Sequence, residues 1–72
     1  MREWLKKARS EKGLTMKEMA NKLGISESYY SLIENGERQK KMDLLLMSGL
    51  SAALNIPIAK IAKAESEAIY QK

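Results

Sequence analysis

The stretch Thr15–Gly36 constrains the fold most strongly, because its sequence, TMKEMANKLGISESYYSLIENG, is typical of two short helices joined by a tight turn. Thr15 is a favourable N-cap, and Glu18 follows at the spacing of a capping box, in which each side chain accepts a hydrogen bond from the other residue's backbone N–H. Apolar residues then recur at helical spacing until Gly24, which supplies a left-handed stop. The first half of the stretch therefore predicts a short helix.

The second half predicts another short helix, which Ser26 can cap and which runs to Asn35. Tyr30 and Ile33 form its apolar face. Ala20, in the first helix, is a small residue at the point where the two helices must cross. Two amphipathic helices joined this closely predict a helix-turn-helix.

The composition favours a single all-α domain over residues 1–72. Folding at this length buries about 60% of the surface of the extended chain, which is near the lower limit for an unassisted core. Glycine is sparse, Pro57 is the only proline, and clusters of β-branched or aromatic residues are few. No apolar run approaches the ~20 residues of a membrane span, so we expect no membrane contact.

The absence of cysteine and histidine restricts the chemistry that the chain can perform. It excludes disulfides, thiolate nucleophiles, the usual zinc ligand sets and Ser–His catalysis. We expect no enzymatic activity, no metal, no cofactor and no small-molecule ligand, and a reducing, cytoplasmic compartment fits this composition. The net charge of +4 and the pI near 9.5 are compatible with a polyanionic partner, although many small domains are equally basic.

A first helix is predicted over residues 2–12. Its inner stripe is expected to contain Met1, Leu5, Ala8 and Arg9. Arg9 is a cation on an apolar face, where burial without an anionic partner is costly. Glu34 has matching character, so the two residues form a candidate buried ion pair; alternatively, each reaches solvent independently. Trp4 lies beside the stripe and either covers an edge of the core or lies in a subunit contact.

Two further helices are predicted after a polar, mostly basic connection at residues 37–42. Asp43 can cap the fourth helix, Asn55 ends it, and Pro57 suits the first turn of the fifth. The expected inner residues of these helices are Leu44, Met47, Leu50, Ser51, Leu54, Ile58, Ile61, Ala62, Ala68 and Ile69. The tail has little apolar content, so we expect fraying near Gln71.

The order of these features resembles the Cro/cI-type (XRE-like) helix-turn-helix repressors. The matching motifs are LT-x-x-E-x-A-x-x-L-G-I-S, S-Y-Y-S-L-I-E-N-G and a helix ending AALNIP, which together cover roughly residues 2–61. The resemblance implies a five-helix, lambda-repressor-like bundle with the motif at residues 15–36 and a C-terminal helix from about residue 57. It also implies binding of double-stranded operator DNA as a homodimer. Arg9 and Glu34 match positions that form a buried ion pair in several relatives.

The resemblance further implies which side chains face DNA, because the recognition helix, residues 27–35, enters the major groove with its N-terminal end. The residues expected at base edges are Glu27, Ser28, Ser31 and Leu32. Those expected near phosphates are Met16, Lys17, Lys22, Tyr29, Asn35, Arg38, Lys40 and Lys41. For each lysine, a solvated surface position is the alternative. The apolar excess of the last two helices, with the family's usual contact region, predicts a dimer interface at Leu45, Leu46, Ile58, Ala62 and Ile69. Alternatively, these residues and Trp4 complete the core of the monomer.

Three features depart from the family pattern. Met16 stands where relatives commonly have a glutamine that contacts phosphate. The recognition positions contain no arginine, asparagine or glutamine before Asn35, so bidentate base contacts are missing, and Glu27 brings a negative charge towards DNA. The connection after Gly36 is about three residues longer than in the shortest family members.

Two functions remain open from the sequence. The first is a sequence-specific DNA-binding transcriptional regulator, repressor-like and dimeric on a palindromic operator. The second is a small helical protein-interaction module, such as the antitoxin partner of a toxin, in which DNA binding is weak or secondary. A log-linear dependence of duplex binding on salt would favour the first.

Overall fold

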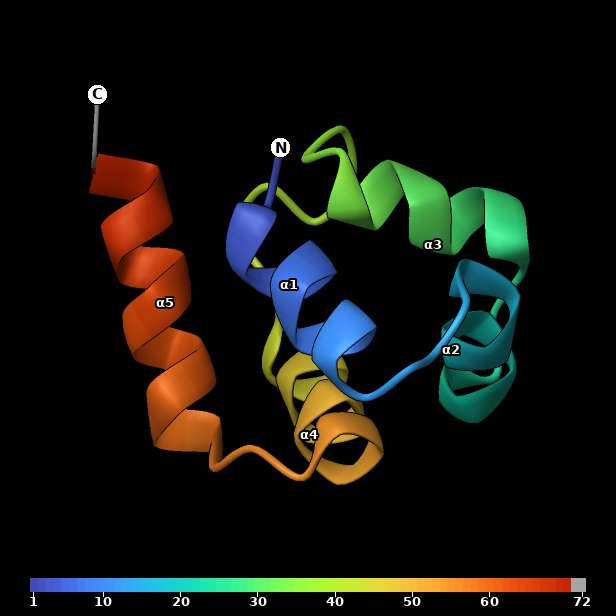
Figure 1. The fold of residues 1–72 in the computed structure, drawn as a ribbon. Helices are drawn as coiled ribbons and strands as arrows, with labels where there is room; N and C mark the ends of the chain where they lie inside the picture. The colour runs from blue at the N-terminus through green and yellow to red at the C-terminus, as the bar shows by residue number, and fades with distance from the viewer. Residues whose placement is uncertain (71–72) are drawn as a thin grey trace.

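The protein folds into five helices in the part of the chain that the structure describes (Figure 1). The structure is a computed structural model, which describes the backbone of residues 1–70 and the side-chain surroundings of residues 1–67. The helices are α1 (Glu3–Glu11), α2 (Met16–Leu23), α3 (Glu27–Glu34), α4 (Leu44–Leu54) and α5 (Ile58–Tyr70). The predicted all-α fold is confirmed, and residues 1–70 contain no strand. The predictions for the side chains of Ala68 and Ile69, and for fraying at Gln71, lie outside the described residues.

The helices are arranged so that α2 and α5 lie on opposite sides of the bundle (Figure 1). α2 packs against α3 and α4, α1 packs against α3, and α5 packs against α4. The core lies where these contacts meet. Its largest fully buried side chains are Leu5, Met19, Tyr30, Ile33, Leu50, Leu54 and Ile61.

Side-chain caps fix where three of the helices begin. The Thr15 hydroxyl accepts from the Glu18 backbone N–H at 3.1 Å, and the Glu18 carboxylate accepts from the Thr15 N–H at 2.8 Å. The predicted capping box is therefore present, and its hydrogen bonds with Thr15, the backbone one first, lower the pKa of Glu18. Ser26 and Asp43 cap α3 and α4 in the same way, by accepting from backbone N–H groups at 3.1 and 2.8 Å.

Gly49, in the middle of α4, allows close contact between α4 and α2. A Cβ atom at this position would lie 2.9 Å from Cδ2 of Leu23. Glycine inside a helix costs about 1 kcal/mol of stability relative to alanine. The close packing of α4 against α2, which a larger residue would prevent, offsets this cost. Ala20, the small residue predicted where α2 and α3 cross, is buried in the core at 2% exposure.

Two predictions about α1 are wrong in detail. α1 begins at Glu3 rather than at residue 2, and Lys12 is its C-cap. Met1 was expected on the inner stripe but is 63% exposed, whereas Arg2 is 5% exposed. The reason is that Arg2 occupies the N-cap position of α1, and its side chain forms buried hydrogen bonds with other segments, including one to the Ile33 carbonyl.

The inner face of α4 also differs from the prediction. Leu44 was expected inside and is 69% exposed. Leu54, Leu50, Met47 and the capping residue follow one another at intervals of three or four residues, so they share one face of α4. Leu44 comes one residue after the cap, and its side chain therefore points away from this face. Met42, which the sequence placed in a polar connection, is 7% exposed and covers this end of the core.

The inner face of α5 contains an acidic residue that the prediction missed. Ile61 is fully buried, but Ala62 is exposed and Ile58 is 38% exposed. Glu65, one helical turn after Ile61, is only 4% exposed. The stripe through Ile61 therefore continues to Glu65 rather than to Ala62, because residues four apart lie on one helix face.

Candidate nucleic-acid interface

The turn between α2 and α3 fixes how α3 is presented. Gly24 adopts the left-handed conformation with φ of 72°, and the Ile25 N–H donates to the Ala20 carbonyl at 3.0 Å. The inward side of α3 is closed, because Tyr30 and Ile33 are fully buried. The opposite side of α3 is therefore the one available to a partner.

The predicted base-facing residues lie on this outer side, with unequal exposure. Glu27 and Ser28, in the first turn of α3, are exposed. Ser31 and Leu32, one turn later, are half-buried. The N-terminal end of α3 is thus the most accessible part of the helix.

The predicted phosphate-facing residues fall into two groups. Six are exposed on α2 or in and around the connection after α3: Lys17, Lys22, Asn35, Arg38, Lys40 and Lys41. Met16 and Tyr29 are half-buried and pack against the core. The Tyr29 hydroxyl accepts from the Gln39 side-chain amide at 3.2 Å, so this residue has an intramolecular role.

Arg9 and Glu34 lie together and join α1 to α3. Nε of Arg9 is 2.9 Å from Oε2 of Glu34, and Nη2 donates to Oε1 at 3.2 Å. The Tyr30 hydroxyl donates to the same carboxylate at 2.7 Å, and Nη1 of Arg9 donates to the Leu14 carbonyl at 2.7 Å. The carboxylate therefore accepts from two helices, and this arrangement fixes the C-terminal end of α3 against α1.

The protonation of this cluster follows from its geometry. Burial opposes the ionisation of Glu34 most strongly, yet hydrogen bonds from Arg9 and Tyr30 keep its pKa below the ordinary value of 4.5. The hydrogen bond to Glu34 raises the pKa of Arg9. Burial, followed by donation to Glu34, raises the pKa of Tyr30. At neutral pH the cluster is a carboxylate, a guanidinium and a neutral phenol.

The lowered pKa of Glu34 predicts an acid-dependent loss of stability. Its contribution is complete above the ordinary value of 4.5 and is lost as the pH falls through the lower pKa of the folded state. We therefore expect the difference in free energy of unfolding between the wild type and Glu34→Gln to shrink progressively below pH 4.5. Denaturant titrations of both chains across the acid range measure this difference. The pH-dependent effect of Glu18 on stability is present in both chains, so it cancels in the difference. A difference that stays constant with pH would contradict the prediction.

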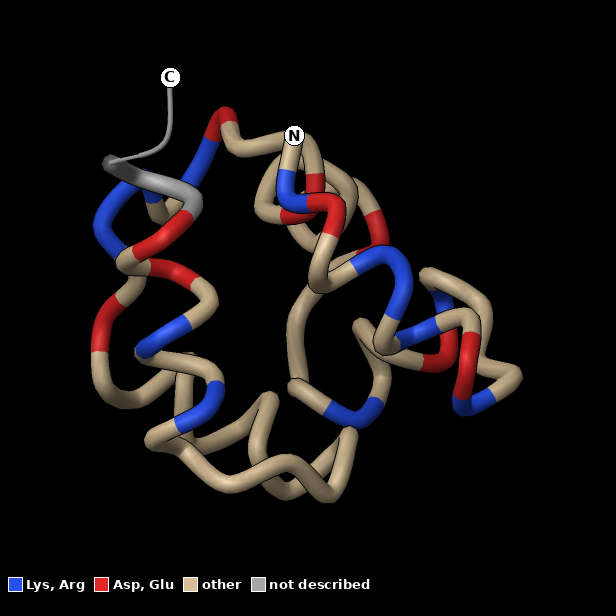
Figure 2. Tube along the Cα trace, turned by 60° about the vertical axis from the view of Figure 1, so that its left-hand side comes forward, with Lys and Arg blue, Asp and Glu red and all other residues tan. Residues whose placement is uncertain are grey.

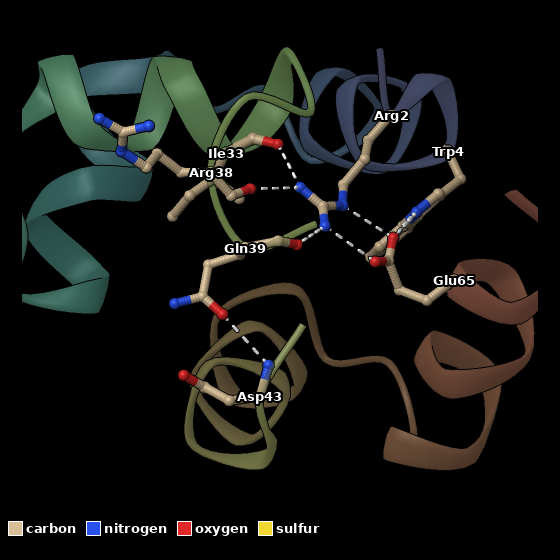
Figure 3. Close-up of polar contacts among 7 residues, drawn as sticks. All are labelled: Arg2, Trp4, Ile33, Arg38, Gln39, Asp43 and Glu65. Carbon is tan, nitrogen blue, oxygen red and sulfur yellow. Dashed lines mark hydrogen bonds and ion pairs between the residues drawn. The ribbon is translucent and has the colours of Figure 1, made fainter. Parts of the chain in front are cut away.

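A second buried ion pair, which the sequence analysis missed, joins Arg2 to Glu65 (Figure 3). Nε and Nη2 of Arg2 lie 2.8 and 3.0 Å from the two carboxylate oxygens. The Trp4 indole N–H donates to the same carboxylate at 2.7 Å, so Trp4 is held at an edge of the core. The available signal was an acidic residue four positions after Ile61, on the apolar stripe of the last helix.

The Arg2 guanidinium also donates to three backbone carbonyls. Nη1 donates to the carbonyls of Ile33 and Arg38, the latter at 3.1 Å, and Nη2 donates to the carbonyl of Gln39. These acceptors lie at the end of α3 and in the connection that follows it (Figure 3). Arg2 therefore connects the start of the chain, α5 and the segment after α3.

The residues predicted to form a dimer interface do not form one surface. Leu45, 84% exposed, and the half-buried Leu46 lie at the start of α4. They line a cleft of about 550 Å³ together with Leu23, Ile25 and Tyr29 of the helix-turn-helix. Ile58 and Ala62 lie on α5, on the other side of the bundle (Figure 1), and the side chain of Ile69 lies outside the described residues.

Comparison with known proteins agrees with this geometry. A family model described as "Helix-turn-helix" matches residues 5–61, which contain most of α1, all of α2 to α4 and the start of α5. The chain belongs to this helix-turn-helix family.

Two curated relatives of the helix-turn-helix chain come from Bacillus subtilis (strain 168). One, named as the uncharacterized HTH-type transcriptional regulator YqaF, is 54% identical over 39 residues, which are 54% of this chain and 51% of the relative. The other, named as the uncharacterized HTH-type transcriptional regulator YqaE, is 37% identical over 70 residues, 96% of this chain and 59% of the relative. The chain thus spans between half and three-fifths of the length of these relatives. No solved structure matches it significantly.

Charge is distributed unevenly over this helix-turn-helix chain. Lys and Arg positions occur around the bundle rather than on one face, and α4 carries no charged residue (Figure 2). Residues 15–43, which contain α2, α3 and the connection, carry as many acidic as basic residues, and most of the positive net charge comes from residues 1–14. The helix-turn-helix is therefore not strongly basic by itself.

The part of the chain that the structure describes has neither a candidate metal site nor a single helix that could span a membrane. It contains no group of three or more acidic, histidine or cysteine residues that could hold a metal ion. No single helix in this part of the chain is long and apolar enough to cross a membrane; α4 and residues Ile58–Glu67 reach such a length only together, across a bend of 117°.

Proposed function

We propose that this helix-turn-helix chain is a sequence-specific, double-stranded-DNA-binding transcriptional regulator that places α3 in the major groove. The observation that carries the proposal is the division of α3 into two sides. Tyr30, Ile33 and Glu34 are buried, whereas Glu27 and Ser28 are exposed at the N-terminal end. That end is the part of a recognition helix that meets base edges. The names of the two relatives support the same function.

Base recognition would use short and polar side chains. Glu27 can accept from a cytosine amino group, and the hydroxyls of Ser28 and Ser31 can bond several base edges. Leu32 is half-buried, which leaves part of its side chain available to a thymine methyl group. None of these contacts is bidentate, so a single α3 would discriminate among bases only modestly.

The proposal includes a homodimer on a palindromic operator, and the balanced charge of residues 15–43 is the reason. A module without net positive charge gains little from phosphate contacts alone, and such contacts supply most non-specific affinity. Two copies can combine two modest interactions. The exposed apolar residues of α5, Ile58 and Ala62, are the dimer surface that we propose. The proposed activity is repression in the cytoplasm, since a dimer bound to an operator can occlude it.

A helical interaction module remains the second candidate function, because Leu44 and Leu45 are exposed side by side at the start of α4. Selection of duplexes from a random pool with the purified chain distinguishes the two. A DNA-binding regulator enriches a common sequence, and its affinity falls log-linearly with salt. A pool that shows no enrichment, with no salt-dependent duplex binding, would favour the interaction module.

Removal of one basic residue from the connection after α3 is expected to weaken binding to all sequences about equally. Arg38→Ala or Lys40→Ala should each lower the slope of log affinity against log salt by roughly one, because one phosphate contact is lost. Lys63→Ala, an exposed lysine on α5, is the matched control and should leave the slope unchanged. An altered base preference with an unchanged slope would show that these residues do not contact phosphates.

A further inference from the structure

The connection between α3 and α4 carries the three basic residues proposed to contact phosphates beyond α3 but has no helix or strand of its own. Arg38, Lys40 and Lys41 lie in this segment, residues 35–43, and all three are exposed. Ordering the backbone of a flexible residue costs about 1–2 kcal/mol, so a disordered connection would weaken every contact made from it. Its conformation before binding is therefore important for affinity.

One guanidinium holds this connection from within the bundle (Figure 3). Arg2 donates to the carbonyls of Ile33, Arg38 and Gln39, and its remaining donors bond Glu65. The side chains of Arg2 and Glu65 are only 6% and 5% exposed. A planar guanidinium presents its N–H groups in fixed directions, so its pairing with Glu65 determines where the three carbonyls must lie.

Gln39 shows that the connection needs such support. Its φ is 55°, in the left-handed region that residues other than glycine seldom occupy, at a cost of about 1–2 kcal/mol. Its carbonyl accepts from Arg2, its side-chain oxygen accepts from the Asp43 N–H at 3.1 Å, and its side-chain N–H group donates to Tyr29. Bonds from three different segments thus maintain a backbone conformation that is unfavourable in isolation.

We propose that Arg2, oriented by Glu65 of α5, is a positioning residue for DNA binding that holds the connection in the conformation presenting Arg38, Lys40 and Lys41. The inference rests on the proposed function for the identity of the ligand. It adds a buried residue whose hydrogen bonds to the connection are made to backbone carbonyls. It also makes α5 a part of the DNA-binding apparatus, because Glu65 lies on α5.

The double variant Arg2→Met/Glu65→Leu separates positioning from stability. Replacing both members of a buried ion pair by apolar residues is often neutral or stabilising, so the bundle should remain folded. The connection, however, loses the donor to its carbonyls. We expect faster amide hydrogen exchange at Glu37, Arg38 and Asp43, whose N–H groups are hydrogen-bonded in the structure, with α2 amides unchanged. Duplex affinity should fall about tenfold, the equivalent of ordering about one residue.

Arg2→Lys provides a second variant that retains the charge opposite Glu65. The ammonium group lacks the planar fork, so it can pair with the carboxylate without reaching all three carbonyls. The same loss of protection and affinity is expected, with little change in the free energy of unfolding. Ile61→Val, a methylene deletion on the same face of α5, is the matched control and should change neither the exchange of the connection nor the duplex affinity of the folded chain.

Two results would overturn the proposal. If Arg2→Lys and the double variant are folded and both retain wild-type exchange in the connection and wild-type affinity, Arg2 has only a structural role. The second result is that the wild type binds no duplex, even though the variants show faster amide exchange in the connection. In that case the proposed function is wrong, and Arg2 cannot be a positioning residue for DNA binding. The first result leaves the proposed function intact, so the two failures are distinguishable.

Discussion

Arg9→Met or Glu34→Leu is expected to lower the free energy of unfolding by about 3–5 kcal/mol, whereas the double variant should lose much less. Each single replacement leaves the other charge buried without its partner. The Arg9 side chain is 13% exposed and that of Glu34 is 5% exposed, so water cannot fully compensate. A domain of this size has a total stability of about 5 kcal/mol, and either single variant could therefore be largely unfolded at room temperature.

Chemical denaturation of the two single variants and the double variant tests this expectation as a double-mutant cycle. Arg38→Met is a suitable control, because it removes an exposed guanidinium that has no ionic partner within hydrogen-bonding distance in the described residues. Its effect should stay within about 0.5 kcal/mol. Additive effects below 1 kcal/mol at Arg9 and Glu34 would mean that their contact does not contribute to stability.

The second large effect is expected in the comparison of a half-site with a palindrome. A duplex with two half-sites about 34 Å apart should bind at least ~100-fold more tightly than one half-site, because the second contact becomes intramolecular. Insertion of half a helical turn between the half-sites places them on opposite faces of the duplex and should abolish most of the gain. Sedimentation equilibrium with each duplex provides both the stoichiometry and the affinity.

The structure supplies a matched pair of variants for this experiment. Ala62→Glu introduces a charge on the exposed surface of α5 and should reduce palindrome binding towards the half-site value. Leu45→Glu introduces the same charge at an exposed position of α4, on the cleft beside the helix-turn-helix, and should preserve the ratio. If Leu45→Glu rather than Ala62→Glu removes the gain, the dimer interface lies at α4. A half-site bound as tightly as the palindrome would rule out cooperative dimer binding.

The helix-turn-helix could be predicted from sequence because its determinants are local. Thr15 and Glu18 form a capping box within one helical turn, and Gly24 ends the helix that they begin. Such signals depend on neighbours three or four residues away, so they are the same in the sequence and in the fold. The contact between Arg9 and Glu34 could also be predicted, because a single cation on an apolar helix face requires an anionic partner.

The support of the connection could not be predicted in the same way. Arg2 and Glu65 are 63 residues apart, and neither lies in a motif. Arg2 precedes the first helical turn, where side-chain direction does not follow the helical period. Leu44 and Met42 also differ from their expected positions, because Asp43 caps α4 as predicted but does not by itself decide which face of the helix meets the core. These features depend on how distant segments meet.

The two buried ion pairs have one consequence for how α3 can move. Both act on its C-terminal end, through the Glu34 carboxylate and the Ile33 carbonyl. The N-terminal end follows the turn that the Ile25 N–H closes on the Ala20 carbonyl, and α3 packs against α2. We expect α3, held at both ends, to move only with the whole bundle, so that operators of different groove width are accommodated by rotation of the domain on DNA rather than by tilting of the helix within it.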